Sequence, residues 1–190
     1  MNTANKLTLL RIILIPFFLV CFYIEELTVR TVSLNGFLIP YANIIALIIF
    51  LIAALTDFVD GYIARKYNMI TDFGKFMDPL ADKLLVTAAL LIFIEKDLIA
   101  SWIVFIILAR EFMVTGLRTI AASKGVIMAA GWSGKLKTVI QFIMIGTLLL
   151  LNYPFALIDF PMDQILIALA AILTLSSGIE YLWKNAHVLK

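Results

Sequence analysis

Cysteine and histidine are nearly absent from this sequence, with only Cys21 and His187 in 190 residues. A single cysteine excludes a disulfide framework and a thiolate metal site within the chain. The lone histidine stands three residues from the end, which disfavours a buried catalytic imidazole. Charged residues are also scarce, at 15%. Any chemistry must therefore come from carboxylates, lysine, arginine, hydroxyls, the backbone or bound ions.

Hydrophobic residues are abundant instead. They make up 63% of the chain, against about 45–50% in ordinary soluble domains, and the mean hydropathy is +1.05. A soluble fold of this size cannot hide so much apolar surface. Six apolar stretches approach the roughly 20 residues that a helix needs to cross a bilayer: 7–24, 41–62, 76–94, 99–120, 136–151 and 164–183. We predict an all-α polytopic membrane protein, a six-transmembrane-helix bundle with a cytoplasm-facing polar cavity, formed as a single domain over residues 1–190.

The charges in the connections orient this bundle. Eleven of the fifteen lysine and arginine residues fall at the termini and in the second-to-third and fourth-to-fifth connections. The opposite connections hold only Arg30 and Lys96, beside six acidic residues. By the positive-inside rule, both termini are expected in the cytoplasm. We expect Arg11 to reach the lipid headgroups along the membrane, and Lys137 to be a plain flanking charge.

Four aspartates stand at the cytoplasmic ends of the second and third predicted spans. Asp57 and Asp60 are three residues apart, and Asp78 and Asp82 are four apart, so each pair shares one face of a helix. A short connection makes the two helices antiparallel neighbours. Ionisable residues at membrane depth are costly and usually face a partner or an aqueous cavity. We therefore expect the four carboxylates to converge.

Converging carboxylates cannot all stay ionised without compensation, so either some are protonated or cations lie between them. Oxygen ligands without histidine or cysteine favour Mg²⁺ or Mn²⁺, and four carboxylates can hold two such ions. Two divalent cations suit phosphoryl or phosphatidyl transfer, because they clamp a pyrophosphate and neutralise the leaving group. The alternatives are a solvated cluster of helix-end aspartates and the ion site of a small cation transporter.

The same segment carries a longer pattern, D-x2-D-G-x2-A-R-x8-G-x3-D-x3-D, from Asp57 to Asp82. It resembles the signature of the CDP-alcohol phosphatidyltransferase family at all eight specified positions. Residues 5–11, 109–118 and 134–138 are similar to the bacterial branch of that family that uses glycerol 3-phosphate. Ala4 stands where that branch usually has proline.

The resemblance implies a role for each matching residue. Asp57, Asp60 and Asp78 would bind one metal ion, and Asp57, Asp78 and Asp82 the second. Asp82 would also be the catalytic general base. Contacts to the CDP-diacylglycerol donor would come from Asn5, Gly61, Ala64, Arg65, Thr71 and Gly74.

Cationic residues in the fourth and fifth spans are candidates for binding the acceptor phosphate. Arg118 and Lys135 lie at cytoplasmic ends, and Gly134 beside Lys135 permits close approach of an anion. Their alternative role is positive-inside flanking. Arg110 and Glu111 lie near the middle of a span, about 100° apart on the helix, so we expect them to pair with other helices. Arg110 either joins a structural ion-pair network or faces the acceptor phosphate.

The resulting hypothesis is a multi-pass enzyme of the cytoplasmic membrane, with its active site on the cytoplasmic side. It would transfer a phosphatidyl group from CDP-diacylglycerol to sn-glycerol 3-phosphate, using two divalent cations, Mg²⁺ or Mn²⁺. The alternatives are the same chemistry with inositol phosphate, serine or phosphatidylglycerol as acceptor, or a cation transporter. Membrane lipids are expected partners and nucleic acid is not. The resemblance also implies a homodimer.

Overall fold

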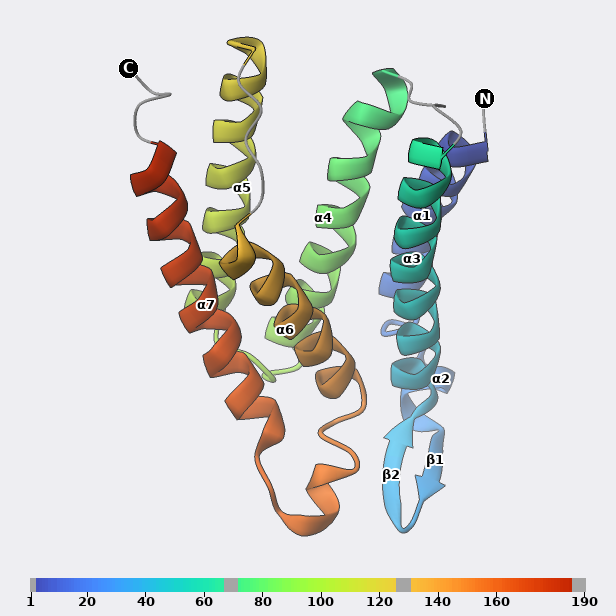
Figure 1. Ribbon diagram of the computed structural model, residues 1–190. Helices are drawn as coiled ribbons and strands as arrows, with labels where there is room; N and C mark the ends of the chain where they lie inside the picture. Colours follow the sequence, from blue (N-terminus) through green and yellow to red (C-terminus); the bar gives the residue numbers. More distant parts are fainter. Residues whose placement is uncertain (1–2, 67–71, 126–130, 186–190) are drawn as a thin grey trace. The chain divides into compact units, whose positions relative to one another are not determined.

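The structure is a computed structural model, and it describes residues 3–66, 72–125 and 131–185 (Figure 1). In these residues the elements follow one another as α1 (Thr3–Val20), α2 (Glu25–Val29), β1 (Thr31–Leu34), β2 (Phe37–Pro40), α3 (Tyr41–Lys66), α4 (Asp72–Glu95), α5 (Ser101–Ser123), α6 (Trp132–Leu149), the 3₁₀ helix η1 (Phe155–Ile158) and α7 (Met162–Asn185).

The prediction of a mainly helical protein is confirmed, and each predicted span coincides with one long helix: α1, α3, α4, α5, α6 or α7. Most of these helices extend beyond the apolar stretch that predicted them, because polar residues near their ends continue the helical backbone. Among the described residues, α7 is the one helix that is long and apolar enough to cross a membrane, and Tyr41–Thr56 of α3 is an apolar but shorter segment.

A β-hairpin between α2 and α3 departs from the all-α prediction. Thr31 pairs with Pro40 and Leu34 with Phe37 in antiparallel register. The two-residue turn has positive φ at Asn35 (52°) and Gly36 (84°), as a type I′ turn requires. Asn-Gly between two short extended runs is a strong hairpin signal, although a pattern of long apolar stretches does not indicate it.

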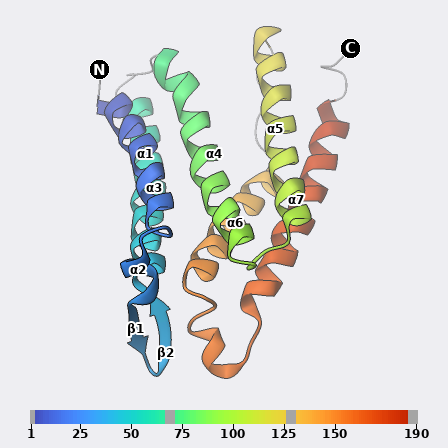
Figure 2. The same cartoon turned by 180° about the vertical axis from the view of Figure 1, so that it is seen from behind.

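The chain divides into two compact units, Met1–Ile92 and Phe93–Lys190. In the first unit α1 packs along α3, as Figures 1 and 2 both show. Three alanines of α3, Ala42, Ala46 and Ala53, are completely buried. Small residues at such an interface let two helix backbones approach closely.

Arg11 of α1 belongs to this interface, and the expectation that it reaches the headgroups is wrong. The residue is only 1% exposed, and its Nε donates a hydrogen bond to the backbone oxygen of Ala53 at 3.2 Å. A guanidinium between two helices needs acceptors within the protein, and the α3 backbone supplies one.

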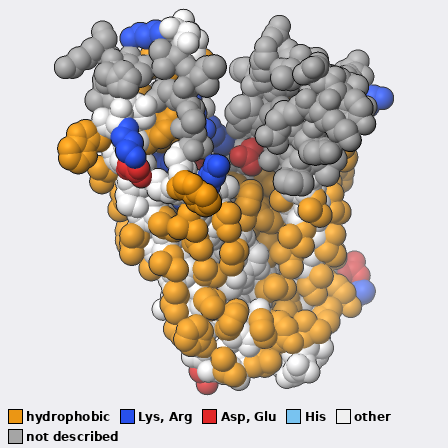
Figure 3. All heavy atoms as spheres, in the orientation of Figure 1, with side chains coloured by type: hydrophobic (Ala, Val, Ile, Leu, Met, Phe, Trp, Pro, Cys, Tyr) orange, Lys and Arg blue, Asp and Glu red, His pale blue; other side chains and the backbone are white. Residues whose placement is uncertain are grey.

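In the second unit α7 packs against both α5 and α6. Its inner face includes Thr174, Ser177 and Tyr181, all buried. Its outer face carries large apolar side chains that are 39–83% exposed: Ile165, Leu169, Ile172, Leu175, Ile179 and Trp183. Hydrophobic side chains dominate the described surface drawn in Figure 3. Exposed apolar surface on this scale marks a contact with lipid or protein.

Candidate active site

The eight signature positions fall on two helices of the first unit. Positions 57–65 lie on α3 and positions 74–82 on α4, so the helical spacing assumed for each aspartate pair is present in the backbone. Thr71 lies outside the described residues. So do the side chains of Asn5, Asp57, Asp60, Gly61, Ala64, Arg65, Gly74 and Asp78. Their predicted roles remain predictions.

Asp82 is the signature aspartate whose side chain is described, and it is half-buried. The described side chains contain no group of three or more histidine, cysteine, aspartate or glutamate residues that could hold a metal ion. Four carboxylates on two helix faces have the oxygen chemistry that hard divalent cations prefer.

A second cluster of predicted residues meets in a pocket of the second unit, with a volume of about 170 Å³. Arg110 and Arg118 of α5 line it, with Gly134 of α6. The rest of the lining comes from α7 and the start of α6, and most of it is polar: Gly131, Ser133, Ser177, Glu180, Tyr181, Lys184 and Asn185. Two guanidinium groups around one cavity suit an anionic ligand, because planar guanidinium binds phosphate oxygens in pairs.

Arg110 is packed between two glycines. A Cβ atom on Gly178 would lie 3.0 Å from Cγ of Arg110, and one on Gly134 would lie 3.4 Å from its Nη2. Glycine at these positions of α7 and α6 therefore makes the room that the arginine occupies. The residue is 9% exposed, and its Nε has no hydrogen-bond partner among the described residues. A buried donor of this kind is costly unless a ligand satisfies it.

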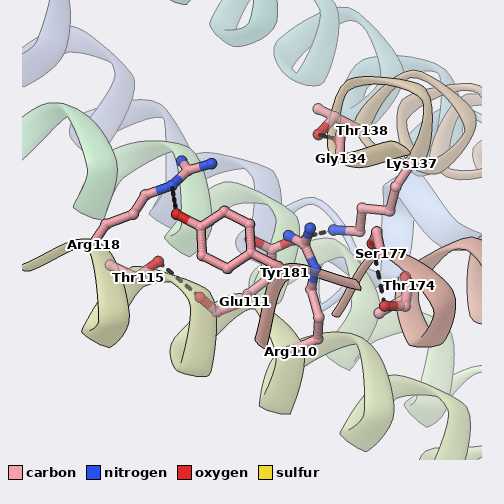
Figure 4. Close-up of polar contacts among 10 residues, drawn as sticks. All are labelled: Arg110, Glu111, Thr115, Arg118, Gly134, Lys137, Thr138, Thr174, Ser177 and Tyr181. Carbon is pink, nitrogen blue, oxygen red and sulfur yellow. Dashed lines mark hydrogen bonds and ion pairs between the residues drawn. The ribbon is translucent and has the colours of Figure 1, made fainter. Parts of the chain in front are cut away.

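Arg118 lies about two helical turns after Arg110 on α5. It contacts Tyr181 of α7 (Figure 4). Its Nε donates a hydrogen bond to the phenolic oxygen at 3.1 Å. Its guanidinium carbon also lies 5.4 Å from the centre of the tyrosine ring, within the range of a cation–π contact.

Glu111 carries the negative charge next to these arginines. It forms an ion pair with Lys137 of α6, and one of its oxygens lies 3.6 Å from Nη1 of Arg110. The prediction that these two residues pair with other helices is thus confirmed for Glu111. It is wrong for Arg110, which pairs with Glu111 itself. Lys137, which we expected to be a flanking charge, has a side chain only 2% exposed. A cation can be buried there because a carboxylate from α5 compensates it.

Lys135 differs from the two arginines. It is exposed, and its ammonium lies 5.6 Å from the centre of the Trp132 ring. It is not among the residues that line the pocket. The structure therefore groups Arg110 and Arg118, and it directs the Lys135 amine to an aromatic ring instead.

The α7 residues of the pocket did not emerge from the sequence. A signal for Ser177 and Tyr181 exists. With Thr174 and Gly178, they recur at intervals of three and four residues, so they form a face of polar and small residues in an otherwise apolar span. Polar residues inside a membrane span usually face the protein interior. Ser133 and Glu180 complete this side, with the serine hydroxyl donating to the Glu180 carboxylate at 2.6 Å.

These features define a class. Long helices with exposed apolar faces, aspartate pairs on two of them and a pocket lined by two arginines are typical of a membrane-associated protein that acts on anionic, phosphate-containing molecules.

Comparison with known proteins identifies the family. The sequence profile described as CDP-alcohol phosphatidyltransferase matches residues 1–176. The chain is 47% identical over 189 residues to a protein of Bacillus subtilis (strain 168), covering 100% of this chain and 97% of the relative. That relative is named CDP-diacylglycerol--glycerol-3-phosphate 3-phosphatidyltransferase.

Two further relatives agree. A protein of the same name from Haemophilus influenzae is 40% identical over 186 residues, covering 95% of this chain and 91% of the relative. A protein of Mycobacterium tuberculosis (strain ATCC 25618 / H37Rv), named probable phosphatidylglycerophosphate synthase, is 38% identical, covering 95% and 79%. The chain belongs to the CDP-alcohol phosphatidyltransferase family, as its signature predicted.

Proposed function

We propose that this chain is a phosphatidylglycerophosphate synthase. It transfers the phosphatidyl group of CDP-diacylglycerol to sn-glycerol 3-phosphate and releases CMP. The observation that carries this proposal is the 47% identity, over the whole chain, to a relative named for that reaction. The complete signature between Asp57 and Asp82 supports the same chemistry, because it supplies the oxygen ligands that phosphatidyl transfer needs.

The proposed enzyme is one catalytic domain that spans the cytoplasmic membrane six times. Six helices of 18–26 residues support this arrangement, since 18 residues extend about 27 Å against a hydrocarbon core of about 30 Å. The exposed apolar face of α7 supports a lipid environment. The positive charges at the termini and in two connections support cytoplasmic termini and a cytoplasmic active site.

Two divalent cations, Mg²⁺ or Mn²⁺, are part of the proposal. Asp57, Asp60 and Asp78 bind one, and Asp57, Asp78 and Asp82 bind the other. When bound, the cations would neutralise the negative charge that develops on the phosphate of the leaving CMP. The support is the donor chemistry, four carboxylates on two helical faces without histidine or cysteine.

Asp82 is the general base in this proposal. It takes the proton of the acceptor hydroxyl while that oxygen forms a bond to the phosphatidyl phosphorus. The bond from this phosphorus to the bridging oxygen of CMP breaks, so the negative charge leaves with CMP. General-base help of this kind is typically worth about 10²–10⁴ in rate.

The donor is oriented by the residues around the signature. Asn5, Arg65 and Thr71 provide polar contacts to the cytidine diphosphate. Gly61, Ala64 and Gly74 leave room for the diphosphate near the backbone, because their side chains are absent or small.

The acceptor phosphate binds in the arginine pocket of the second unit. Arg110 and Arg118 both line that pocket, and the unsatisfied Nε of Arg110 supports an anionic ligand there. Lys135 follows Gly134 in the chain and adds positive charge without lining the pocket. We also propose a homodimer, which cross-linking in membranes would test.

The test is an assay of the purified protein in lipid nanodiscs with CDP-diacylglycerol and Mg²⁺. Labelled glycerol 3-phosphate, inositol phosphate, serine and phosphatidylglycerol are compared as acceptors, and CMP release is measured with product formation. Glycerol 3-phosphate should give the highest kcat/KM. A better result with another acceptor would overturn the acceptor assignment, and no CMP release with any acceptor would overturn the reaction.

A further inference from the structure

Tyr181 contacts Arg118 in two ways that complement each other. The phenolic oxygen accepts the hydrogen bond from Nε of Arg118 at 3.1 Å, while the ring lies 5.4 Å from the guanidinium carbon. Figure 4 shows the arginine reaching over the tyrosine from α5, with its terminal nitrogens directed away from the phenol. Both contacts act on the same guanidinium, so together they restrict its movement more than either would alone.

The tyrosine is itself held in place. It is 8% exposed, and its ring packs with Val114 and Leu117 of α5 in a small buried cluster. The residue also lines the pocket. A buried ring has few rotamers, so Tyr181 is a rigid support, whereas Arg118 is a long and exposed side chain that loses much rotamer entropy when it binds a ligand.

The hydrogen bond to Tyr181 uses Nε of Arg118, the guanidinium nitrogen that is bonded to the rest of the side chain. In the described part of the chain, this bond through Nε is the hydrogen bond that Arg118 makes. Both terminal nitrogens therefore keep their donors for a ligand. Two parallel N–H groups on a fixed plane match two oxygens of a phosphate, and a prearranged plane binds with a smaller entropic cost.

We propose that Tyr181 is a positioning residue for the acceptor: it fixes the Arg118 guanidinium for two-point binding of the phosphate of glycerol 3-phosphate. This inference rests on the proposed function, in which Arg118 binds that phosphate. Tyr181 acts through Arg118 and contributes to acceptor binding, not to the proton transfer or to the binding of the lipid donor.

The experiment compares the unchanged protein with Tyr181→Phe, Arg118→Ala and the double variant in nanodiscs. Glycerol 3-phosphate is varied at saturating CDP-diacylglycerol, and CDP-diacylglycerol is varied separately at saturating glycerol 3-phosphate. Phenylalanine keeps the ring and its packing but removes the acceptor oxygen. We expect Tyr181→Phe to raise the KM for glycerol 3-phosphate about 3- to 10-fold, with kcat, the KM for CDP-diacylglycerol and the Tm unchanged. Arg118→Ala should raise the same KM about 10- to 150-fold. The double variant should match Arg118→Ala, because the tyrosine has nothing left to position.

The outcomes separate the inference from the proposed function. If Arg118→Ala raises the KM and Tyr181→Phe does not, the positioning role is wrong and the phosphate site stands. Independent, multiplying effects in the double variant would mean that Tyr181 does not act through Arg118. A lower Tm with both KM values raised would make Tyr181 a packing residue only. An unchanged KM in Arg118→Ala would overturn both ideas. Tyr41→Phe, at the start of α3, is the matched control and should change nothing.

Discussion

Replacing Gly178 by alanine tests whether the space around Arg110 matters for function. A Cβ atom at this position would lie 3.0 Å from Cγ of Arg110, whereas carbon atoms are most stable about 3.5–4.0 Å apart. The arginine must therefore move by about 0.5 Å or more, or α7 must shift away from α5. The guanidinium of Arg110 lines the pocket, so either movement displaces a predicted phosphate ligand.

The matched control is Gly116→Ala on α5, where a Cβ atom would meet nothing within 4 Å. Both substitutions gain about 1 kcal/mol of helix propensity. Only Gly178→Ala carries an overpacking cost, which is typically about 1–3 kcal/mol. We expect Gly116→Ala to raise the Tm in detergent slightly. The free energy of unfolding of Gly178→Ala should be about 1–3 kcal/mol lower than that of Gly116→Ala.

Enzyme kinetics provide the second measurement on this pair. Gly178→Ala should raise the KM for glycerol 3-phosphate about 10-fold, since a displaced guanidinium loses a charge-assisted hydrogen bond. Gly116→Ala should leave this KM unchanged. Equal stability and equal KM values for the two variants would refute the idea that glycine at 178 makes room for a functional arginine.

Three further predictions concern the metal ions and the buried ion pair. Excess EDTA should abolish activity and Mg²⁺ or Mn²⁺ should restore it; full turnover in EDTA would exclude a metal-dependent reaction. Asp78→Ala should remove nearly all activity, while Asp72→Ala, outside the signature, should keep most of it because a helix-start aspartate contributes mainly through the helix dipole. Equal losses would mean that the register of the signature is wrong. Lys137→Met should cost about 3–5 kcal/mol of stability, because it leaves Glu111 without its cross-helix partner; the double variant with Glu111→Gln should recover part of that loss, and a simple sum of two losses would contradict the pairing.

The positions of the helices could be predicted from the sequence because they depend on a local quantity, the length of each apolar stretch. The ends could not, since a helix continues through polar residues wherever its backbone bonds are satisfied. The hairpin was predictable from Asn35-Gly36 alone. Strands of four residues are too short to appear in a pattern of 20-residue apolar stretches.

The arrangement of the cationic residues was predictable only in part. Arg110 and Arg118 were candidates for phosphate binding from their place in a span, and they do line the same pocket. The burial of Arg11 and Lys137 was not foreseen, because it depends on acceptors from other helices. Tyr181 was missed for the same reason: its partner lies 63 positions away in the sequence, and an isolated tyrosine in an apolar run resembles an ordinary core residue.

The hydrogen bond from Arg11 to Ala53 has a consequence for how the first unit opens. In an α-helix, the carbonyl of residue 53 is also the acceptor for the amide of residue 57, which is the first aspartate of the signature. For that amide to exchange with solvent deuterium, its hydrogen bond to the carbonyl oxygen of residue 53 must break. Arg11 of α1 also donates a hydrogen bond to this oxygen. We therefore expect the amides of residues 53–57 to exchange only when α1 and α3 separate. Their protection against exchange should be that of a cooperative unit, which is higher than the protection of a fraying helix end. An Arg11→Met variant should exchange faster at amide 57 than at the hairpin amides, which do not depend on this bond.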